Sequence, residues 1–308
     1  MLRQAVHRWR AAALLPALCT IGLLGATTRA TAAETSPPPG NNGAYLASRL
    51  LPSKSTKPCT RKIAPIYEAD AIVTGTDMRQ RPWGFAQTLR EVLVKVSGDP
   101  RLKNDPRTEE LAAHADRLVA CFAYLDLMAA TPLHDDQGTA DRPHRLTVSF
   151  EPAKIDAVLA DFGERPWRGA RPVIVPVLLV HGRKPPPYVL SAELPAGEEQ
   201  RAAFANAAGE FGIKVRLPSE AELAKWGPAA EHFPYPEAKA PASAAPGEAV
   251  VVGTLDWSET LPGWIGSWRT RWHGADHRWG IEGVNYDAAF RDIVGGVVLL
   301  ASGRGRPD

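Results

Sequence analysis

The sequence predicts an α+β protein built from two small α/β sandwich-like domains, and three observations carry this prediction. Apolar residues recur at helical spacing in "RPWGFAQTLREVLVKVSG", where a helix is expected to end at Gly98. Alternating runs such as "RLTVSFEP", and the wholly apolar run "VIVPVLLV", are typical of strands. Near the C-terminus, three short strands in succession precede a helix, which indicates a three-strand antiparallel meander closed by that helix.

The N-terminal domain is expected over residues 61–168. Alternating β-branched residues predict a strand over 63–76, which Gly75 and Asp77 end. The helix over 81–97 is followed by a second predicted helix over 107–119. The strand that contains "RLTVSFEP" then leads into a helix that Gly163 ends, so the domain alternates between helices and strands.

The C-terminal domain is expected over residues 169–301. Ser219 and Glu222, spaced three residues apart, form a capping box that predicts a short helix ending near Trp226. The Pro- and Ala-rich stretch 228–248 is predicted to be a surface loop. The other elements follow from periodicity: strands over 173–180, 213–218, 249–257, 266–272 and 277–283, and helices over 198–212 and 286–300.

The first 32 residues have the three-part layout of a secretory signal peptide. A basic start precedes an apolar stretch over 11–26, and Ala30 and Ala32 give the small-residue pattern of a cleavage site. The apolar stretch is too short for a membrane anchor, which needs about 20 apolar residues. We therefore expect a periplasmic or secreted protein, cleaved near Ala32, with a flexible leader over 33–60 and a disordered tail over 302–308.

The charge balance disfavours several classes of partner. Removing residues 1–32 deletes four of the 36 basic residues and none of the 34 acidic ones, so the mature chain carries slightly more acid than base. Nucleic-acid binding calls for a basic surface, so no nucleic-acid partner is expected. No later apolar run reaches spanning length, which predicts no membrane span after cleavage.

Two cysteines remain after cleavage, Cys59 and Cys121. In an oxidising compartment an even pair favours a disulfide, and closing a loop of this length stabilises a fold by about 4 kcal/mol. Two buried thiols are the alternative.

Catalytic and cofactor motifs are not found in the sequence: it has no nucleophile elbow, phosphate loop or dinucleotide-binding glycine pattern, so no cofactor is expected. "HGADH", with His273, Asp276 and His277, is better explained as a solvated turn than as a metal site. A carboxylate-dependent hydrolase remains an alternative function, with acids drawn from "HDDQGTAD" or from Asp256 and Glu259.

Five of the nine tryptophans fall between residues 257 and 279. On a strand, Trp264, Trp268 and Trp272 share one face, while Arg269 and Arg271 share the other. We favour a core role for this tryptophan face, packed under the final helix. The alternative is an exposed aromatic ladder that stacks on sugar rings, with the two arginines binding nearby acidic groups.

The segments "VLVKVSG", "CFAYLDL", "RLTVSF" and "PWRGARPV" resemble an exported proteobacterial family, the domain of unknown function 2066 (DUF2066). The resemblance covers about residues 64–301 and implies an envelope location without an assigned activity. Together with the lack of catalytic motifs, it favours a non-enzymatic binding module for another envelope component, a protein or a glycan.

Overall fold

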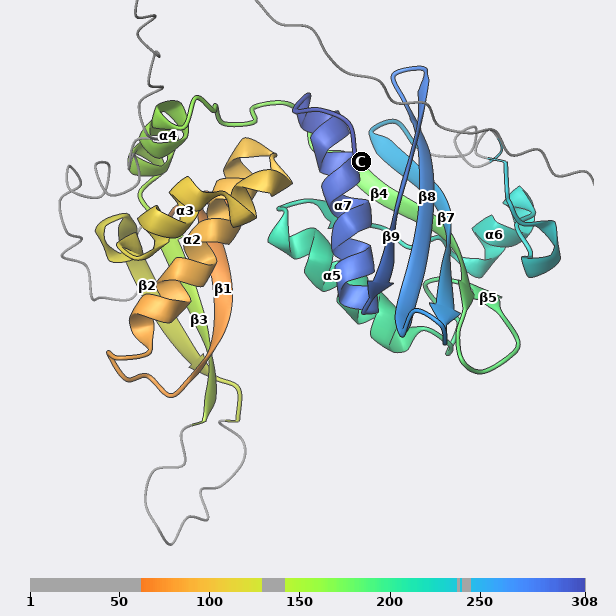
Figure 1. Cartoon of the computed structure of the whole chain (residues 1–308), viewed down its shortest axis with the longest axis horizontal. Helices are drawn as coiled ribbons and strands as arrows, with labels where there is room; N and C mark the ends of the chain where they lie inside the picture. Colours follow the sequence, from red (N-terminus) through yellow and green to blue (C-terminus); the bar gives the residue numbers. More distant parts are fainter. Residues whose placement is uncertain (1–61, 129–141, 237–238, 240–244, 308) are drawn as a thin grey trace, which may run out of the picture. The chain divides into compact units, whose positions relative to one another are not determined.

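The structure is a computed structural model that describes residues 62–128, 142–236, 239 and 245–307. Six α-helices and nine strands in this part of the chain form two sheets, which confirms the predicted α+β class (Figure 1). None of the described helices is long and apolar enough to cross a membrane. The predicted signal peptide, the leader over 33–60 and Cys59 lie outside the described residues.

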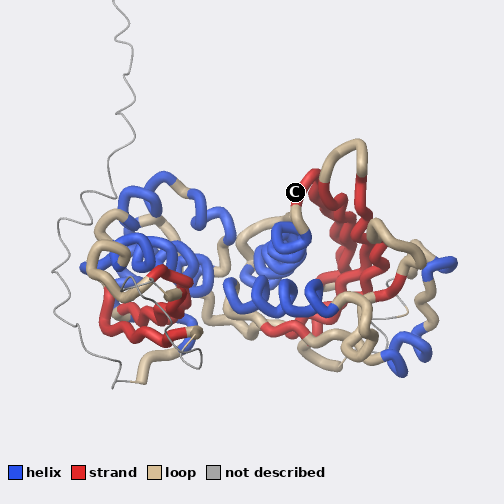
Figure 2. Tube along the Cα trace, turned by 90° about the horizontal axis from the view of Figure 1, so that it is seen from below, coloured by secondary structure: helices blue, strands red, loops and turns tan. Residues whose placement is uncertain are grey.

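The first sheet has three antiparallel strands in the order β1-β3-β2. Its strands are β1 (Glu68–Thr74), β2 (Val119–Asp126) and β3 (Pro143–Phe150). Helices α2 (Arg81–Ser97) and α3 (Pro106–Ala112) connect β1 to β2, and α4 (Pro152–Asp161) follows β3. Figure 2 shows helices gathered on one side of this sheet, and the apolar stripe of α2, including Leu89, Val92 and Leu93, is buried.

Two predicted boundaries in this part were wrong. The strand predicted from residue 63 begins only at Glu68, because Pro65–Tyr67 forms a 3-10 turn before it. The helix predicted over 107–119 ends at Ala112, and Val119 already pairs with Phe150 in the sheet. Tertiary pairing therefore overrides the local helical pattern at the end of this segment.

The second sheet has six strands. Its order is β5-β4-β7-β8-β9, and β6 also pairs with β4. The elements are β4 (Val173–His181), β5 (Tyr188–Val189), α5 (Glu198–Glu210), β6 (Lys214–Val215), α6 (Glu220–Trp226), β7 (Glu248–Ser258), β8 (Gly263–Trp272), β9 (Ala275–Val284) and α7 (Tyr286–Ser302). Strands β4 and β7 are parallel, and β7, β8 and β9 form the predicted antiparallel meander.

Helices cover the two faces of this sheet unequally. Figure 1 shows α5 and α7 together on one side and α6 on the other. The capping box of Ser219 and Glu222 is present at the start of α6, as predicted. The final helix runs to Ser302, two residues beyond the expected end, and Gly303 ends it in the left-handed conformation with φ 71°.

Two features of the second sheet were not predicted. Strand β5 is only two residues long and carries too little periodicity to be recognised. The stretch 228–248 was expected to be a surface loop, yet Tyr235 is 1 % exposed and its hydroxyl donates to the carbonyl of Trp226 at 2.5 Å. Its ring completes a small apolar cluster with Val177 and Val252 on the α6 side of the sheet.

The tryptophan face of β8 packs beneath α7. Trp268 is 1 % exposed, and its indole Nε1–H donates to the Asp292 carboxylate on α7 at 2.9 Å. Trp279 of β9 lies directly across from Trp268, and its Nε1–H donates to the Asp292 carbonyl at 3.3 Å. Two indole hydrogen bonds therefore join the tryptophan face of the sheet to α7, the helix that closes the fold.

Glycines make room for these rings. A Cβ on Gly266 would lie 2.1 Å from the ring of Trp268, and one on Gly296 would lie 2.6 Å from the ring of Trp279. Neither contact is possible for a real side chain, so both positions need glycine because the indoles approach the backbone closely. Gly296 thus occurs within a helix despite a cost of about 1 kcal/mol relative to alanine.

Asp292 is a carboxyl group within this apolar layer. Burial raises its pKa to about 6 from 3.8, although the indole donors of Trp268 and Trp279 pull the pKa the other way. An acid whose native pKa lies above its unfolded value keeps its proton to higher pH in the native state. This group therefore lowers the free energy of unfolding as the pH rises from about 4 to 6.

Replacing Trp268 by alanine tests the importance of this layer. Trp268→Ala removes a buried ring and its hydrogen bond, so the free energy of unfolding should fall by about 3 to 5 kcal/mol. Urea unfolding followed by far-UV circular dichroism measures the loss. Trp83→Ala, at a position that is 55 % exposed on α2, is the control and should cost less than about 1 kcal/mol. Similar losses for both variants would contradict a buried role for Trp268.

Asp292→Asn tests the titration. The asparagine still accepts from Trp268 but carries no charge, so the variant should gain stability relative to wild type as the pH rises from 4.5 to 7.5. A shift of about two pKa units corresponds to about 3 kcal/mol, and partial solvent exposure reduces this to about 1 to 2 kcal/mol. Urea unfolding at both pH values gives the difference. An unchanged difference between wild type and Asp292→Asn at the two pH values would contradict the raised pKa.

Candidate functional site

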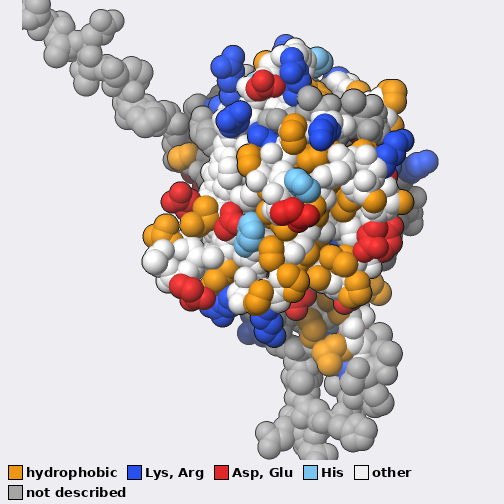
Figure 3. Space-filling view, turned by 90° about the vertical axis from the view of Figure 1, so that its right-hand side faces the viewer, with side chains coloured by type: hydrophobic (Ala, Val, Ile, Leu, Met, Phe, Trp, Pro, Cys, Tyr) orange, Lys and Arg blue, Asp and Glu red, His pale blue; other side chains and the backbone are white. Residues whose placement is uncertain are grey.

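The face of the second sheet that carries α6, called here the α6 face, is less completely covered than the face under α7. Strand alternation places Val252 and Thr254 of β7, Ser267 and Arg269 of β8, and Arg278 of β9 on it. Figure 3 views the molecule from the side that carries α6 and shows hydrophobic, acidic and histidine side chains mixed together, with basic side chains gathered toward the top. The α6 face therefore offers polar groups at its surface.

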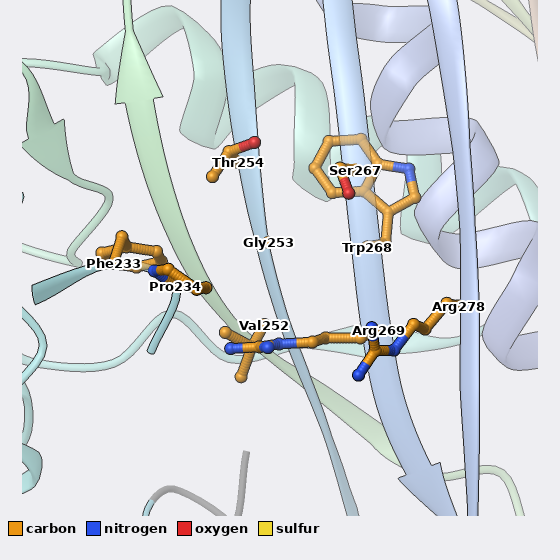
Figure 4. A pocket seen from close by; sticks show the side chains of 9 residues that line it. All are labelled: Phe233, Pro234, Val252, Gly253, Thr254, Ser267, Trp268, Arg269 and Arg278. Atoms are coloured by element: carbon orange, nitrogen blue, oxygen red, sulfur yellow. The ribbon is translucent and has the colours of Figure 1, made fainter. Parts of the chain in front are cut away.

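A hollow of about 250 Å³ opens on this face (Figure 4). The segment before β7 forms one wall, and β7, β8 and β9 form the floor and the other wall. The lining residues are Phe233, Pro234, Val252, Gly253, Thr254, Ser267, Trp268, Arg269 and Arg278. A Cβ on Gly253 would meet the carbonyl oxygen of Ser267 at 2.2 Å, so glycine is required where β7 and β8 approach each other.

Two arginines meet in the hollow. Arg269 and Arg278 are directly opposite each other in the β8–β9 pairing, and Figure 4 shows their side chains extended in the same direction along the floor. Two residues further along β8, on the same face, Arg271 lies opposite Asp276, with 3.9 Å between the guanidinium and the carboxylate. Arg278 makes no such ion pair with any residue that the structure describes. Arg278 thus brings to the hollow a positive charge that has no counterion among the described residues.

Two hydroxyl groups also line the hollow. The side chains of Thr254 and Ser267 lie on neighbouring strands and are Cα partners in the β7–β8 register. Neither hydroxyl makes a hydrogen bond within the described ranges of the chain. Each therefore has a donor and an acceptor to offer to a bound group.

The structure divides the five predicted ligand-binding residues between the two faces of the sheet. Trp268 lies in the core, Trp264 is 9 % exposed, and Trp272 is partly buried. Arg269 lines the hollow, and Arg271 lies beside it in the ion pair with Asp276. An exposed ladder of the three tryptophans is therefore not what the structure presents, whereas the two arginines do lie on the less covered face.

Sequence reasoning did not include Arg278, although the signal for it was present. The turn between β8 and β9 contains two residues, His273 and Gly274, both with positive φ (47° and 82°). A two-residue turn of this kind fixes the register of a hairpin. Pairing Trp272 with Ala275 then places Arg278 opposite Arg269.

A second polar group lies further along the α6 face. His181 ends β4 and is paired with Asp256, two residues before the end of the parallel strand β7. Nδ1 of the imidazole lies 2.5 Å from the carboxylate. Both side chains are a little over two-fifths exposed. In open sheets with parallel strands, ligands bind outside the carboxyl ends of those strands. His181 was not predicted as a site residue.

The structure does not bring Asp256 and Glu259 into a shared arrangement. Asp256 interacts with His181, whereas Glu259 accepts from the Trp257 indole at 2.7 Å and lies 3.7 Å from Arg183. The guanidinium of Arg183 in turn stacks 4.0 Å above the Trp257 ring. The acids of "HDDQGTAD" lie outside the described residues, so their part in the alternative stays a prediction.

The other residues singled out from the sequence are the histidines and aspartate of "HGADH" and the two cysteines. His273 occupies the hairpin turn and Asp276 faces Arg271. The structure brings together no group of three or more potential metal ligands within the ranges it describes. Cys121 is buried in β2, and its predicted disulfide to Cys59 stays a prediction because Cys59 is outside those ranges.

Comparison with known proteins gives one similarity. Residues 61–168 match the family model of a domain of unknown function (DUF8605), which covers about a third of the chain. No curated protein and no solved structure matches the chain. The matched segment ends before β4, so the hollow on the α6 face lies outside it. The chain therefore carries, ahead of its candidate site, a segment similar to a domain that has no assigned activity.

Proposed function

We propose that this protein is an exported, non-enzymatic binding protein of the cell envelope, and that it binds its partner at the hollow on the α6 face. The observation that supports this most is the meeting of two arginines and two hydroxyls in one hollow. Polar groups that converge in a concave site are typical of ligand binding. The export part of the proposal rests on the signal-peptide pattern of residues 1–32.

The arrangement of the hollow favours binding over catalysis. Arginine keeps its charge at every physiological pH, so Arg269 and Arg278 are suited to holding a group and not to transferring protons. The walls come from β7, β8, β9 and the segment around Phe233, and the strands are held firmly by the layer beneath α7. A preformed site of this kind binds without a large ordering cost.

The finer family assignment also belongs to this proposal. The likeness to DUF2066 rests on segments such as "VLVKVSG" and "CFAYLDL", and it would supply an envelope location in proteobacteria. The match of residues 61–168 supports an uncharacterised domain there and carries neither that family nor an origin. The partner, in this proposal, is an envelope protein or glycan.

A hydrolase acting on an envelope polymer is the second candidate, and one observation favours it. The imidazole of His181 and the carboxylate of Asp256 form a pair near the carboxyl ends of two parallel strands. A carboxylate that orients a histidine is a common part of acid–base catalysis. A nucleophile or second acid beside this pair is not evident among the described contacts, so binding is the better supported function.

Ser267→Trp tests the hollow as the binding site. The indole would fill the space between β8 and Phe233 without changing any charge, so capture of the partner should fall at least tenfold. The mature chain, residues 33–308, is immobilised and exposed to solubilised envelope proteins and, separately, to solubilised envelope polysaccharide. Bound material is measured by mass spectrometry and sugar analysis.

The control for this experiment is Thr74→Trp, which adds the same ring at an exposed position of β1. It should capture as much as wild type, and circular dichroism should show both variants folded. Equal capture by both variants would mean that the hollow is not the site. Capture of nothing by the wild-type chain would contradict the binding function as a whole.

Asp256→Asn separates binding from hydrolysis. The substitution removes the negative charge beside His181 while keeping a similar shape. On the binding proposal, neither wild type nor variant releases reducing ends or peptides from purified envelope polymers. Release by the wild-type protein that falls 100-fold or more in a folded Asp256→Asn variant would instead favour the hydrolase.

A further inference from the structure

We infer that the hollow on the α6 face is an oxyanion site that takes an acidic sugar, with the carboxylate or phosphate held by Arg278 and Arg269 and the sugar ring against Phe233 and Pro234. This inference rests on the proposed binding function and names the class of ligand. Three features of the hollow support it: the positive charge of Arg278, the donors that line the hollow, and the volume of the hollow.

The pairing of β8 with β9 places two positive charges directly opposite each other. Like charges directly opposite each other in an antiparallel pair destabilise a sheet, and opposite charges stabilise it. The neighbouring pair follows the favourable pattern, with Arg271 opposite Asp276. Arg278 stands opposite Arg269 and has no acidic partner in the described part of the chain. A bound anion would supply the countercharge that Arg278 lacks among the described residues.

The donors of the hollow suit an oxyanion. Guanidinium groups present N–H donors in a planar fork that matches carboxylate and phosphate oxygens, and such charge-assisted hydrogen bonds are the strong ones. Both arginine side chains lie along the floor (Figure 4). The hydroxyls of Thr254 and Ser267 line the same hollow and are able to donate to the remaining oxygens or to pair with sugar hydroxyls.

The opposite wall provides an apolar surface. Phe233 and Pro234 face β7 across the hollow, as Figure 4 shows. Sugar rings have apolar faces of C–H groups, which pack on aromatic and proline rings, while their hydroxyls need polar partners. One wall that is apolar and one that is cationic therefore suit a ring that carries a single acidic group.

The size of the hollow limits the ligand. Sites for drug-sized molecules occupy about 300 to 1,000 Å³. The volume here, about 250 Å³, is slightly below that range. It suits one sugar residue, so the protein would recognise a terminal or single acidic residue of a glycan and not a long stretch of the chain.

Titration with small sugars tests this inference. The mature protein is titrated with D-glucuronate, D-glucose 6-phosphate and D-glucose, and binding is followed by NMR through the arginine Nε–H signals and by isothermal calorimetry. At least one of the two acidic sugars should bind ten times more tightly than glucose, and the weakening of that binding by salt should be marked. The pair also separates a carboxylate site from a phosphate site.

Arg278→Gln should weaken binding of the acidic sugar at least tenfold. The matched control is Arg271→Gln, because Arg271 lies on the same face of the same hairpin but is paired with Asp276. The control should bind like wild type. The acidic sugar should also raise the melting temperature of wild type and of Arg271→Gln, and leave that of Arg278→Gln unchanged.

Several results would overturn the inference. Equal binding of glucose and both acidic sugars would remove the role of charge, and equal weakening by Arg271→Gln and Arg278→Gln would remove the role of the hollow. A lack of binding by either acidic sugar at 50 mM would also overturn it. If Ser267→Trp abolishes capture of an envelope partner but Arg278→Gln does not, the binding function stands and the oxyanion site does not.

Discussion

The hydrogen bond from the Trp268 indole to the Asp292 carboxylate fixes which face of the second sheet α7 covers. It joins the middle strand of the meander to the middle of α7, and Trp279 adds a second link to the same residue. Because α7 covers this face, the polar side chains of β8 lie on the opposite face. The arginines of the hollow point away from α7 for the same reason that the tryptophans point toward it.

This layer combines features that are each unfavourable alone. A partly buried carboxyl costs free energy, and so does a glycine within a helix. Here the carboxylate accepts a hydrogen bond from an indole N–H, and Gly296 lets the Trp279 ring lie against the helix backbone. The large apolar area of the rings offsets both costs. A fold with smaller residues on β8 and β9 would need neither Asp292 nor Gly296.

Much of the fold was predictable because it depends on short-range patterns. The capping box at Ser219, the helix end at Gly98 and the alternation through β8 are local signals, and the structure confirms all three. The early end of α3 and the burial of Tyr235 depend on partners far along the chain, so no local pattern contains them.

The site was half predictable: alternation separated Arg269 from the tryptophans, but the hollow also needs Phe233, which reaches it only through the folding of an irregular segment. His181 and Asp256 are 75 residues apart and become neighbours only because β4 and β7 pair in parallel.

The length of the two-residue turn at His273 and Gly274 fixes which residues of β9 pair with β8, and therefore which face of the sheet each side chain of β9 occupies. Side chains alternate along β9, so inserting one residue into the turn would move every side chain of β9 to the opposite face of the sheet. Trp279 would then face away from α7, and Arg278 would face it. A two-residue insertion would keep the faces but shift Arg278 away from Arg269. Relatives that share the hollow must therefore conserve the length of this turn even where its residues differ. In a comparison of such sequences, gaps at this turn would identify proteins that have lost the site while keeping the fold.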